Sequence, residues 1–389
     1  MIEDMVRDMR AGLPVPLDQD QLPPGIRSRF VETATGLRTH LLEAAGDDGA
    51  HAPLLLLLHG FPELGYSWRH GMVPLASAGF HVVAPDQRGY GRTTGWDGDY
   101  DGDWESFRLL NLVRDALSLV RALGHESAHA VIGHDFGSPV AALCALVRPD
   151  VFTRVAMMSA PFSGIAPLPL GESPLPAPPD VDRALAGLAR PRKHYQRYFT
   201  TREADGDMRH SAQGVHDFLR AYFHVKSADW PATQPVPLAA WTADELAKMP
   251  TYYVMDRERD MAQTVAPAMP SPEHIASCRW LPDDELAVYS TEFERTGFQG
   301  ALNWYRSMLS PAQRSELLLY SGRRIEVPSC FIAGTKDWGP YQVPGALDTM
   351  RQGLCTDFRG CHFVESAGHW VQQEASGDVV DLLLEYLTF

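Results

Sequence analysis

Short apolar runs between turn residues recur along the chain and predict buried strands. The clearest run is Leu54–Leu58, five leucines between Pro53 and the pair His59-Gly60. A run of this kind suits a strand that is buried on both faces, although leucine alone would also permit a helix. Four further runs show the same pattern: Phe80–Ala84, Ala128–Ile132, Arg154–Met158 and Cys330–Ala333.

Apolar residues at three- and four-residue spacing lie between these runs and predict helices. In the segment 107–123 the spaced residues are Leu110, Val113, Leu117 and Val120. Two more helices are expected in the Ala-rich segment 139–147 and at the end of the chain, 379–387. Alternating strands and helices are typical of the α/β class, in which a mostly parallel sheet is covered by helices on both faces.

The alternation stops after Pro161 and strand signals resume at Ile325–Ala333. Residues 162–312 are rich in Pro, Trp, Tyr, Met and His and show little strand pattern. We expect a mainly helical insertion, or lid, over 162–312, folded over a core made of residues 1–161 and 313–389. The insertion begins with a dense group of prolines, Pro167, Pro169, Pro174, Pro176, Pro178 and Pro179.

Composition narrows the function classes only slightly. The chain has 389 residues, 45% hydrophobic and 21% charged, as in an ordinary folded protein with a sizeable core. The net charge of −15 argues against a protein that reads the nucleic-acid backbone, which would need clustered Lys and Arg. It does not decide the substrate, because a local basic pocket can exist in an acidic protein.

The termini and cysteines favour a cytoplasmic protein without a membrane segment. Met1–Arg10 carries acidic residues and no apolar core, so it does not resemble a signal peptide. The longest apolar run, Leu54–Leu58, is far too short to cross a bilayer. Five cysteines are spread over 144–361; Cys355 and Cys361 could pair across a short loop, but we expect free thiols.

The strongest chemical signal is Gly133-His134-Asp135-Phe136-Gly137, directly after a predicted strand and before a predicted helix. Its frame is that of the G-x-S-x-G nucleophile elbow, a tight turn that presents its central side chain above the sheet. With Asp135 at the centre, attack on a saturated carbon would yield an alkyl ester, so epoxides and carbon–halogen bonds are the natural electrophiles. Taken alone, the pattern fits an Asp that caps the next helix equally well.

The loop after Leu54–Leu58 is His59-Gly60-Phe61-Pro62. In proteins with a nucleophile elbow, the corresponding loop donates a backbone N–H to an oxyanion hole, completed by the residue after the nucleophile. Here the two donors would be the N–H groups of Phe61 and Phe136. Alone, this loop would be taken for an ordinary turn at the end of a strand.

Ester hydrolysis also requires a base that activates water and an acid that orients the base. Asp337 follows the predicted strand at 330–333, and His369 follows another apolar stretch at 361–364. The order nucleophile, acid, base is the one expected after an elbow, and sites in α/β sheets form where strands end. All four features in this order favour a catalytic triad of Asp135, Asp337 and His369.

Together these residues resemble the soluble epoxide hydrolases of the α/β-hydrolase fold, over about residues 28–388 including the lid. The resemblance implies a mostly parallel eight-stranded sheet flanked by helices, with a helical lid inserted. The motifs that carry it are His59–Glu63, Tyr66–Arg69, Pro85–Gly91, His134–Gly137, Asn303–Arg306 and Gly368–Glu374.

The resemblance further implies that two lid tyrosines protonate the epoxide oxygen as the ring opens. Tyr305 matches one of these positions closely and Tyr195 resembles the other, with Tyr198, Tyr252 and Tyr253 as nearby alternatives. A phenol suits this role, because the departing alkoxide needs an acid in the transition state.

The product would be a vicinal diol, with no metal or organic cofactor, in a reaction typical of detoxification. The partners would be a small apolar epoxide and water, with neither nucleic acid nor membrane; the oligomeric state is open, and a homodimer is one option. The residues expected to line the substrate pocket are Phe61, Phe136, Gln196, Trp338 and Trp370.

Two other functions stay open. A haloalkane or haloacid dehalogenase would share the Asp–His–Asp groups. Haloalkane dehalogenases typically place a Trp N–H after the nucleophile, where this chain has Phe136, which carries no donor. Fluoroacetate-type enzymes carry arginines there, whereas this chain continues with 138–141, Ser-Pro-Val-Ala. A non-catalytic ligand-binding member of the fold is the more remote alternative.

Two patterns imitate metal sites. Asp97–Asp103 matches the first half of an EF-hand loop, but Arg108 stands where a bidentate Glu is needed, so we expect a solvated acidic loop. His125 and His129 have the i, i+4 spacing of zinc ligands without an adjacent carboxylate of the zincin type, so we expect them to be structural.

Overall fold

The fold was obtained from a computed structural model that describes residues 12–46, 49–166, 168 and 180–388. The N-terminal segment Met1–Arg10 and the prolines Pro167, Pro169, Pro174, Pro176, Pro178 and Pro179 lie outside the described residues.

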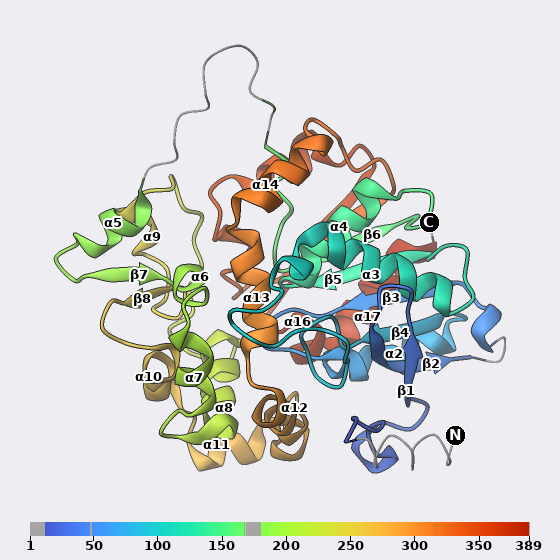
Figure 1. The fold of residues 1–389 in the computed structure, drawn as a ribbon, viewed down its shortest axis with the longest axis horizontal. Helices are drawn as coiled ribbons and strands as arrows, with labels where there is room; N and C mark the ends of the chain where they lie inside the picture. Colours follow the sequence, from blue (N-terminus) through green and yellow to red (C-terminus); the bar gives the residue numbers. More distant parts are fainter. Residues whose placement is uncertain (1–11, 47–48, 167, 169–179, 389) are drawn as a thin grey trace.

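An eight-stranded sheet forms the core, in the order β1-β2-β4-β3-β5-β6-β9-β10 (Figure 1). The six strands from β4 to β10 run parallel, and β2 pairs with both neighbours antiparallel. This confirms the predicted α/β class and the mostly parallel sheet. The strands are β1 Arg27–Glu32, β2 Arg38–Ala45, β3 Leu54–Leu58, β4 His81–Pro85, β5 Ala130–His134, β6 Val155–Met158, β9 Ser329–Gly334 and β10 Phe358–Val364.

The leucine run is a strand because both of its faces are covered. All five side chains of β3 are at most 1% exposed, and the strand pairs with β4 on one side and β5 on the other. Helix α2 packs against α17, and α3 packs against α4. The bounds of these helices are α2 Arg69–Ser77, α3 Leu109–Ala122, α4 Gly137–Val147 and α17 Ser376–Thr388, and short α15 Ala346–Thr349 and α16 Val371–Glu374 precede α17.

Between β6 and β9 the chain forms a lobe of helices with one two-stranded sheet, beside the core in Figure 1. The expected boundary at 312 falls inside α14 (Pro311–Leu317), and the nearest break between elements is at 309–310. The elements of this lobe are α5 Val181–Ala186, β7 Arg192–His194, α6 Tyr195–Tyr198, α7 Glu203–Arg209, α8 Gly214–Lys226, α9 Ala243–Leu246, β8 Val254–Asp256, α10 Met261–Val265, α11 Pro272–Ser277, α12 Asp283–Thr296 and α13 Gln299–Met308.

Helix α13 joins the lid to the core through a close backbone contact. A Cβ atom on Gly89 would clash with the backbone of Gly300, and one on Gly300 would clash with the backbone of Gly89. The indole N–H of Trp304 donates to the carbonyl oxygen of Arg88 at 2.8 Å. The glycine-rich loop after β4 therefore packs directly against α13.

A buried arginine makes a second connection. Arg69 of α2 is 1% exposed, and its guanidinium donates to Glu285 of α12 at 2.5 Å and to the carbonyl oxygen of Trp280 at 3.0 Å. It also donates to Gln373 of the core at 2.7 Å. One core side chain thus fixes the start of α12.

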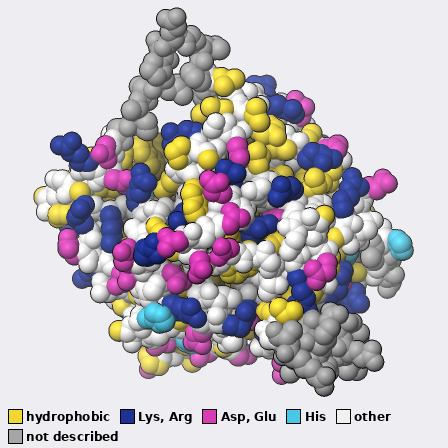
Figure 2. Space-filling view, in the orientation of Figure 1, with side chains coloured by type: hydrophobic (Ala, Val, Ile, Leu, Met, Phe, Trp, Pro, Cys, Tyr) yellow, Lys and Arg dark blue, Asp and Glu magenta, His cyan; other side chains and the backbone are white. Residues whose placement is uncertain are grey.

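Surface features of the described residues are unremarkable. Acidic and basic side chains are interspersed on the face shown in Figure 2. No helix in the described ranges is long and apolar enough to span a membrane. All five cysteines are free, so the alternative pairing of Cys355 with Cys361 is not formed.

Candidate active site

Asp135 stands between β5 and α4 with a φ of 50°, the left-handed region that side chains rarely adopt. The turn closes tightly because three glycines allow the backbones to approach. A Cβ on Gly60 would clash with the Asp135 side chain, one on Gly133 with the backbone of Gly137, and one on Gly137 with the backbone of Leu58. The sequence motif is thus an elbow, and Asp135 points away from the sheet.

Two core groups meet the carboxylate of Asp135. Its Oδ1 accepts the backbone N–H of Phe61 at 2.9 Å, and its Oδ2 lies 3.3 Å from Nε2 of His369. Burial raises the pKa of Asp135, but His369 and the Lys226 ammonium outweigh it and hold the pKa below its usual range. The carboxylate is therefore ionised at neutral pH, as a nucleophile must be.

Asp337 orients His369 from the other side. Nδ1 of His369 lies 3.0 Å from Oδ1 of Asp337, which also accepts the N–H of Gly339 at 2.7 Å. Ser159, at a φ of 67°, donates its hydroxyl proton to Oδ2 of Asp337 at 2.6 Å. Because Asp337 can only accept when ionised, Nδ1 must carry the proton. This contact fixes the ring so that Nε2 faces Asp135.

The two expected oxyanion donors lie at the same turn. The N–H of Phe61 already contacts Asp135, and the N–H of Phe136 makes no hydrogen bond within the described ranges. Phe136 is also the first residue before α4, so its N–H points out of the helix start. An oxygen bound to the carboxyl carbon of Asp135 can therefore find both donors.

Tyr195 and Tyr305 face the same cavity as Asp135. Their ring centroids are 6.0 Å apart. The Tyr195 hydroxyl donates to Gln342 at 3.1 Å and accepts from Gln196 at 3.3 Å, whereas the Tyr305 hydroxyl has no hydrogen-bond partner among the described residues. Burial, reinforced by the negative charge of Asp135, raises the pKa of both phenols. Both therefore hold their protons at neutral pH.

Other tyrosines that the sequence left as alternatives lie elsewhere. The Tyr198 hydroxyl donates to Asp207 at 2.9 Å, and Tyr252 lines a different hollow. The hydroxyl of Tyr253 is buried without a partner in the described part of the chain. None of these three lines the cavity at Asp135.

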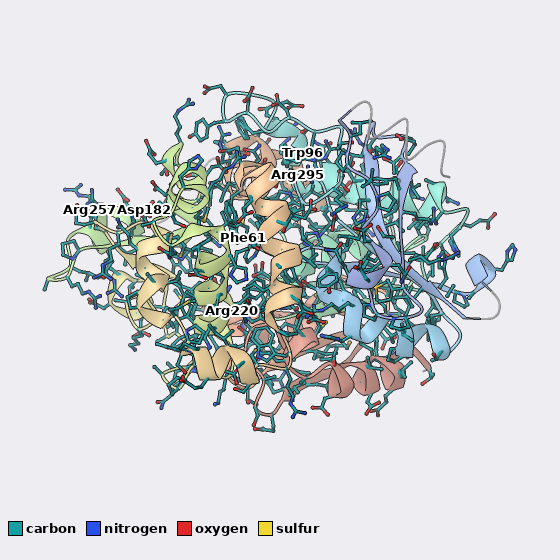
Figure 3. All side chains as sticks on the ribbon, turned by 90° about the horizontal axis from the view of Figure 1, so that it is seen from below. Phe61, Trp96, Asp182, Arg220, Arg257 and Arg295 are labelled. Carbon is teal, nitrogen blue, oxygen red and sulfur yellow. The ribbon has the colours of Figure 1, made fainter. Side chains whose placement is uncertain are left out.

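Of the five residues expected in the substrate pocket, Phe136 and Gln196 line the cavity at Asp135. Phe61, labelled in Figure 3 among the lid helices, does not line the cavity; its ring packs against the lid rings of Phe199 and Tyr305 at 5.0 and 5.8 Å. For the two tryptophans the structure differs from the prediction, because neither lines this cavity. Trp338 lines a separate hollow with Trp230 and Tyr252.

Trp370 does not reach the cavity because its side chain turns into the interior. It is 0% exposed, its indole N–H donates to the carbonyl oxygen of Phe223 at 2.8 Å, and its ring lies 4.4 Å from that of Phe223. The position of Trp370 next to His369 in the sequence did not reveal that its side chain points into the interior. The Trp370 ring packs against that of His369 at 4.6 Å and away from the cavity at Asp135.

A buried network next to Asp135 was missed by sequence reasoning. Glu63 is fully buried and lies 2.6 Å from Nδ1 of His134, whose Nε2 lies 2.7 Å from the carbonyl oxygen of His369. Because Nε2 faces a group that can only accept, it must be protonated. Burial lowers the pKa of His134, but Glu63 outweighs it and raises the pKa above its usual value.

The same carboxylate reaches the loop that carries Phe61 and the helix that follows His369. Glu63 accepts the N–H of Gly60 at 3.1 Å and the amide groups of Gln372 and Gln373 at 2.8 and 3.1 Å. The loops that carry Phe61, Asp135 and His369 are therefore tied to one ion pair. The motifs HGFPE, GHDFG and HWVQQE hold these residues, but only the folded chain brings them together.

Lys226 was also missed. Its side chain is buried at the end of α8, with the ammonium 5.0–5.2 Å from the ring centroids of Tyr222, Tyr253 and Trp370. Its backbone carbonyl accepts the N–H of His369 at 2.9 Å. The lid thus supplies both a cation near Asp135 and a backbone hydrogen bond to His369.

The patterns that imitate metal sites are structural. The carboxylate of Asp97 accepts the N–H groups of Asp99 and Asp103 at 2.9 and 3.0 Å, which closes the acidic loop. His125 lies 2.8 Å from His81, and His129 lies 3.3 Å from the carbonyl oxygen of Leu387.

Comparison with known proteins shows to which class of protein this fold and site belong. The family profile described as alpha/beta hydrolase fold matches residues 53–199. Epoxide hydrolase B of Mycobacterium tuberculosis is 32% identical over 360 residues, which covers 90% of this chain and 96% of the relative. Epoxide hydrolase A of the same organism is 34% identical over 365 residues, 92% of this chain and 97% of the relative.

Solved structures give the same result. An epoxide hydrolase from an endophytic Streptomyces is 33% identical with a TM-score of 0.73, covering 94% of this chain and 96% of that chain. Epoxide hydrolase I of potato (Solanum tuberosum) is 29% identical with a TM-score of 0.71, covering 93% of this chain and 99% of that chain. The chain belongs to the epoxide hydrolases of the α/β-hydrolase fold.

Proposed function

We propose that this chain hydrolyses an apolar epoxide to a vicinal diol through a covalent ester on Asp135. The observation that carries this proposal is the position of Asp135, whose Oδ2 lies beside His369 and which shares a cavity with the phenols of Tyr195 and Tyr305. A nucleophile on one side of a cavity and acids on the other suit the opening of a strained C–O bond.

In the first step, a carboxylate oxygen of Asp135 attacks an epoxide carbon from the side opposite the ring oxygen. The C–O bond of the ring breaks, and the oxygen takes a proton from Tyr305 or Tyr195. The free hydroxyl of Tyr305 is available for this contact, and the Gln342 and Gln196 amides hold that of Tyr195 in place. A β-hydroxyalkyl ester on Asp135 results.

In the second step, Nε2 of His369 removes a proton from water, and the water oxygen attacks the ester carbonyl carbon. The N–H groups of Phe61 and Phe136 stabilise the oxyanion. The bond between the carboxyl carbon and the alkoxy oxygen then breaks, and the alkoxide takes the proton from His369 to leave as the diol. The remaining proton of the water is left on the Asp135 carboxyl group and passes to the phenolate formed in the first step, which restores the ionised carboxylate and the neutral phenol. Asp337 stabilises the transient imidazolium through Nδ1.

The cavity supports a small, mostly apolar substrate. Aromatic and aliphatic side chains dominate its lining, and its polar groups are those assigned to the reaction together with Gln196 and Gln342. The five free cysteines are consistent with a reducing compartment, and we place the chain in the cytoplasm on that ground.

Single turnover in heavy-oxygen water tests the ester route. With enzyme in excess over styrene oxide, water attacks the ester carbonyl, so the heavy oxygen enters Asp135 and the diol carries an unlabelled carboxylate oxygen. We expect the label in the peptide that contains Asp135, as measured by mass spectrometry. Label in the diol with none in the peptide would contradict the covalent route; enzyme incubated without epoxide is the control for exchange.

A halide-release assay on 1-bromobutane separates this proposal from the dehalogenase alternative. A halide site requires N–H donors facing the leaving group. Phe136 offers no side-chain donor, and the Trp304 indole beside it donates to the carbonyl oxygen of Arg88. We expect no halide release above background; release at the rate of diol formation would favour the dehalogenase.

A further inference from the structure

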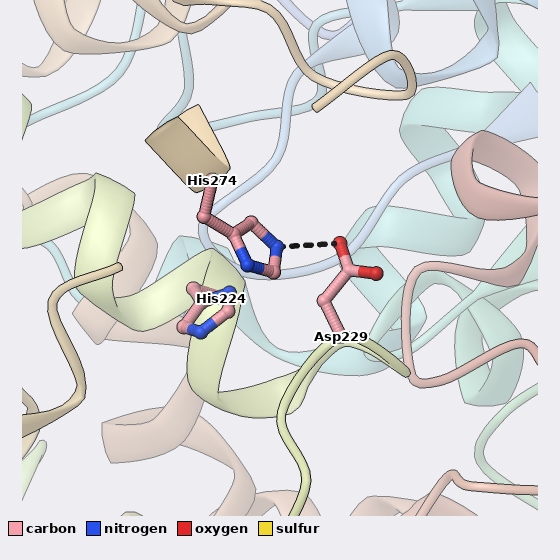
Figure 4. Close-up of side chains that lie close together, drawn as sticks. All are labelled: His224, Asp229 and His274. Atoms are coloured by element: carbon pink, nitrogen blue, oxygen red, sulfur yellow. Dashed lines mark ion pairs between the residues drawn. The ribbon is translucent and has the colours of Figure 1, made fainter. Parts of the chain in front are cut away.

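We propose that His224, Asp229 and His274 of the lid form a binding site for a divalent transition-metal ion. His224 belongs to α8, Asp229 to the loop after it, and His274 to α11 (Figure 4). None of the three lines the cavity at Asp135, so this site is separate from the proposed catalytic groups.

The donor atoms converge closely. One ligand atom from each side chain lies within 4.8 Å of the other two. Nε2 of His274 is 3.5 Å from Oδ2 of Asp229, and the ring centroids of His224 and His274 are 4.8 Å apart. An ion with bonds of about 2.1 Å would hold tetrahedral ligands roughly 3.4 Å apart. Asp229 and His274, at 37% and 38% exposed, have room to make that adjustment.

The ring nitrogens of His224 are free of partners among the described residues. The residue is 8% exposed, and neither nitrogen makes a hydrogen bond within the part of the chain that the structure describes. Its ring contacts are the edges of Trp230 and His274. A ring nitrogen of His224 is therefore available to a metal ion without the loss of a hydrogen bond within the described part of the protein.

Contacts around Asp229 hold this ligand in position. The carboxylate of Asp229 is held by the Trp280 indole N–H at 2.9 Å, and its backbone N–H by Ser227 at 3.2 Å. Such outer contacts orient metal ligands.

The donor set selects the kind of ion. Two imidazoles and one carboxylate suit Zn²⁺ or Ni²⁺, with water completing the coordination, whereas Mg²⁺ and Ca²⁺ prefer oxygen ligands throughout. We therefore choose Zn²⁺ as the probe.

The site lies on the segment that holds the base loop. Between the ligands His224 and Asp229, the carbonyl oxygen of Lys226 accepts the N–H of His369 at 2.9 Å, and the N–H of Ala228 donates to Glu374 at 2.7 Å. Glu374 also accepts the N–H groups of Gly368 and Trp370. A metal ion would thus stabilise the contact between this lid segment and the loop of His369, without taking part in the reaction.

Calorimetric titration of untagged, metal-stripped full-length protein with Zn²⁺ tests this site. We expect one ion per chain with a Kd of about 1 μM or tighter. His274→Ala and Asp229→Asn should each weaken binding at least about tenfold, and Zn²⁺ should raise the thermal midpoint of the wild type but not of these variants. Both positions are half-exposed, so the variants are expected to fold, unlike a change at buried His224.

Two matched variants serve as controls. His210→Ala removes an exposed lid histidine outside the cluster, and Cys278→Ser removes the thiol closest in sequence to His274; both should bind Zn²⁺ as the wild type does. Unchanged affinity in His274→Ala and Asp229→Asn, loss of binding in Cys278→Ser, or no binding up to about 0.1 mM would each overturn the proposal.

Discussion

The core and the lid meet at one cavity but fix their side chains by different means. Asp135, Asp337 and His369 follow core strands and are held by backbone geometry and hydrogen bonds, with Asp135 in the left-handed region. Tyr195 and Tyr305 stand on lid helices, and the Tyr305 ring is held by neighbouring aromatic rings. In the proposed mechanism each core group therefore has a role of its own, whereas the two lid phenols share the protonation of the ring oxygen.

The largest effect should come from the core nucleophile. Asp135→Asn removes the carboxylate that forms the ester, while the neutral amide keeps the shape of the elbow. We expect kcat for epoxide hydrolysis to fall at least about 1,000-fold, with circular dichroism unchanged. Activity within tenfold of the wild type would show that the core does not supply the nucleophile.

The lid should lose activity in two stages. Tyr305→Phe or Tyr195→Phe alone should lower kcat/KM about 10- to 100-fold, because one phenol remains, and the double variant should lose about 1,000-fold or more. Tyr198→Phe is the matched control, since its hydroxyl bonds Asp207 away from the cavity. A double variant no worse than either single one would refute a shared role.

The connection between the lobes should matter for stability more than an exposed pair within the lid. Arg69→Met leaves Glu285 without its buried partner and should lower the free energy of unfolding by about 3 kcal/mol in denaturant titration. Lys248→Met, which breaks the more exposed pair with Glu245, should cost less than about 1 kcal/mol. Equal losses would mean that the pair of Arg69 with Glu285 contributes no more to stability than a surface contact does.

The Arg69 effect should depend on pH. Burial raises the pKa of Glu285, but His70 and Arg69 outweigh it and bring the pKa to about 2. A carboxyl group with a lowered pKa stabilises the fold fully above its unfolded value of about 4.3 and loses this contribution as the pH falls toward 2. The difference between wild type and Arg69→Met should therefore narrow between pH 4 and pH 2 (about the two pKa values).

The smallest effect should come from the lid cation. Lys226→Met removes a positive charge that lowers the pKa of Asp135. The carboxyl pKa should rise, so the acid limb of the kcat/KM profile should move to higher pH, whereas activity at neutral pH should stay within about twofold of the wild type because Asp135 is still ionised there. Lys193→Met, which removes a lid ammonium 4.8 Å from the Tyr198 ring, should leave the profile unchanged. An unmoved acid limb in Lys226→Met would exclude this role.

Much of the core could be predicted from sequence because its strands are continuous apolar runs with turn residues at both ends. Strands β1 and β2 could not, since charged residues interrupt their pattern: Glu43 of β2 is buried, forms an ion pair with Arg29 and lies 2.8 Å from Nε2 of His81. The pairing partners are distant in sequence, so no local signal shows that these charges are satisfied.

The candidate site, like the core, could be predicted from the sequence only in part. Asp135, Asp337 and His369 could be named because each occupies a motif at the end of a strand. The directions of Trp338 and Trp370 could not, because they depend on the lid residues packed against them, and Ser159 and Lys226 reach the site only through tertiary contacts. Sequence motifs thus predict the positions of the candidate reactive groups better than they predict which side chains line the cavity around those groups.

Trapping the ester tests the central claim most directly. His369→Gln keeps the nucleophile and the phenols but removes the base, so the enzyme should form the ester and fail to hydrolyse it. After mixing with styrene oxide, intact mass spectrometry should show a gain of one epoxide mass, located on Asp135 and absent from the double variant with Asp135→Asn. Sustained diol formation by His369→Gln with no adduct would contradict the mechanism.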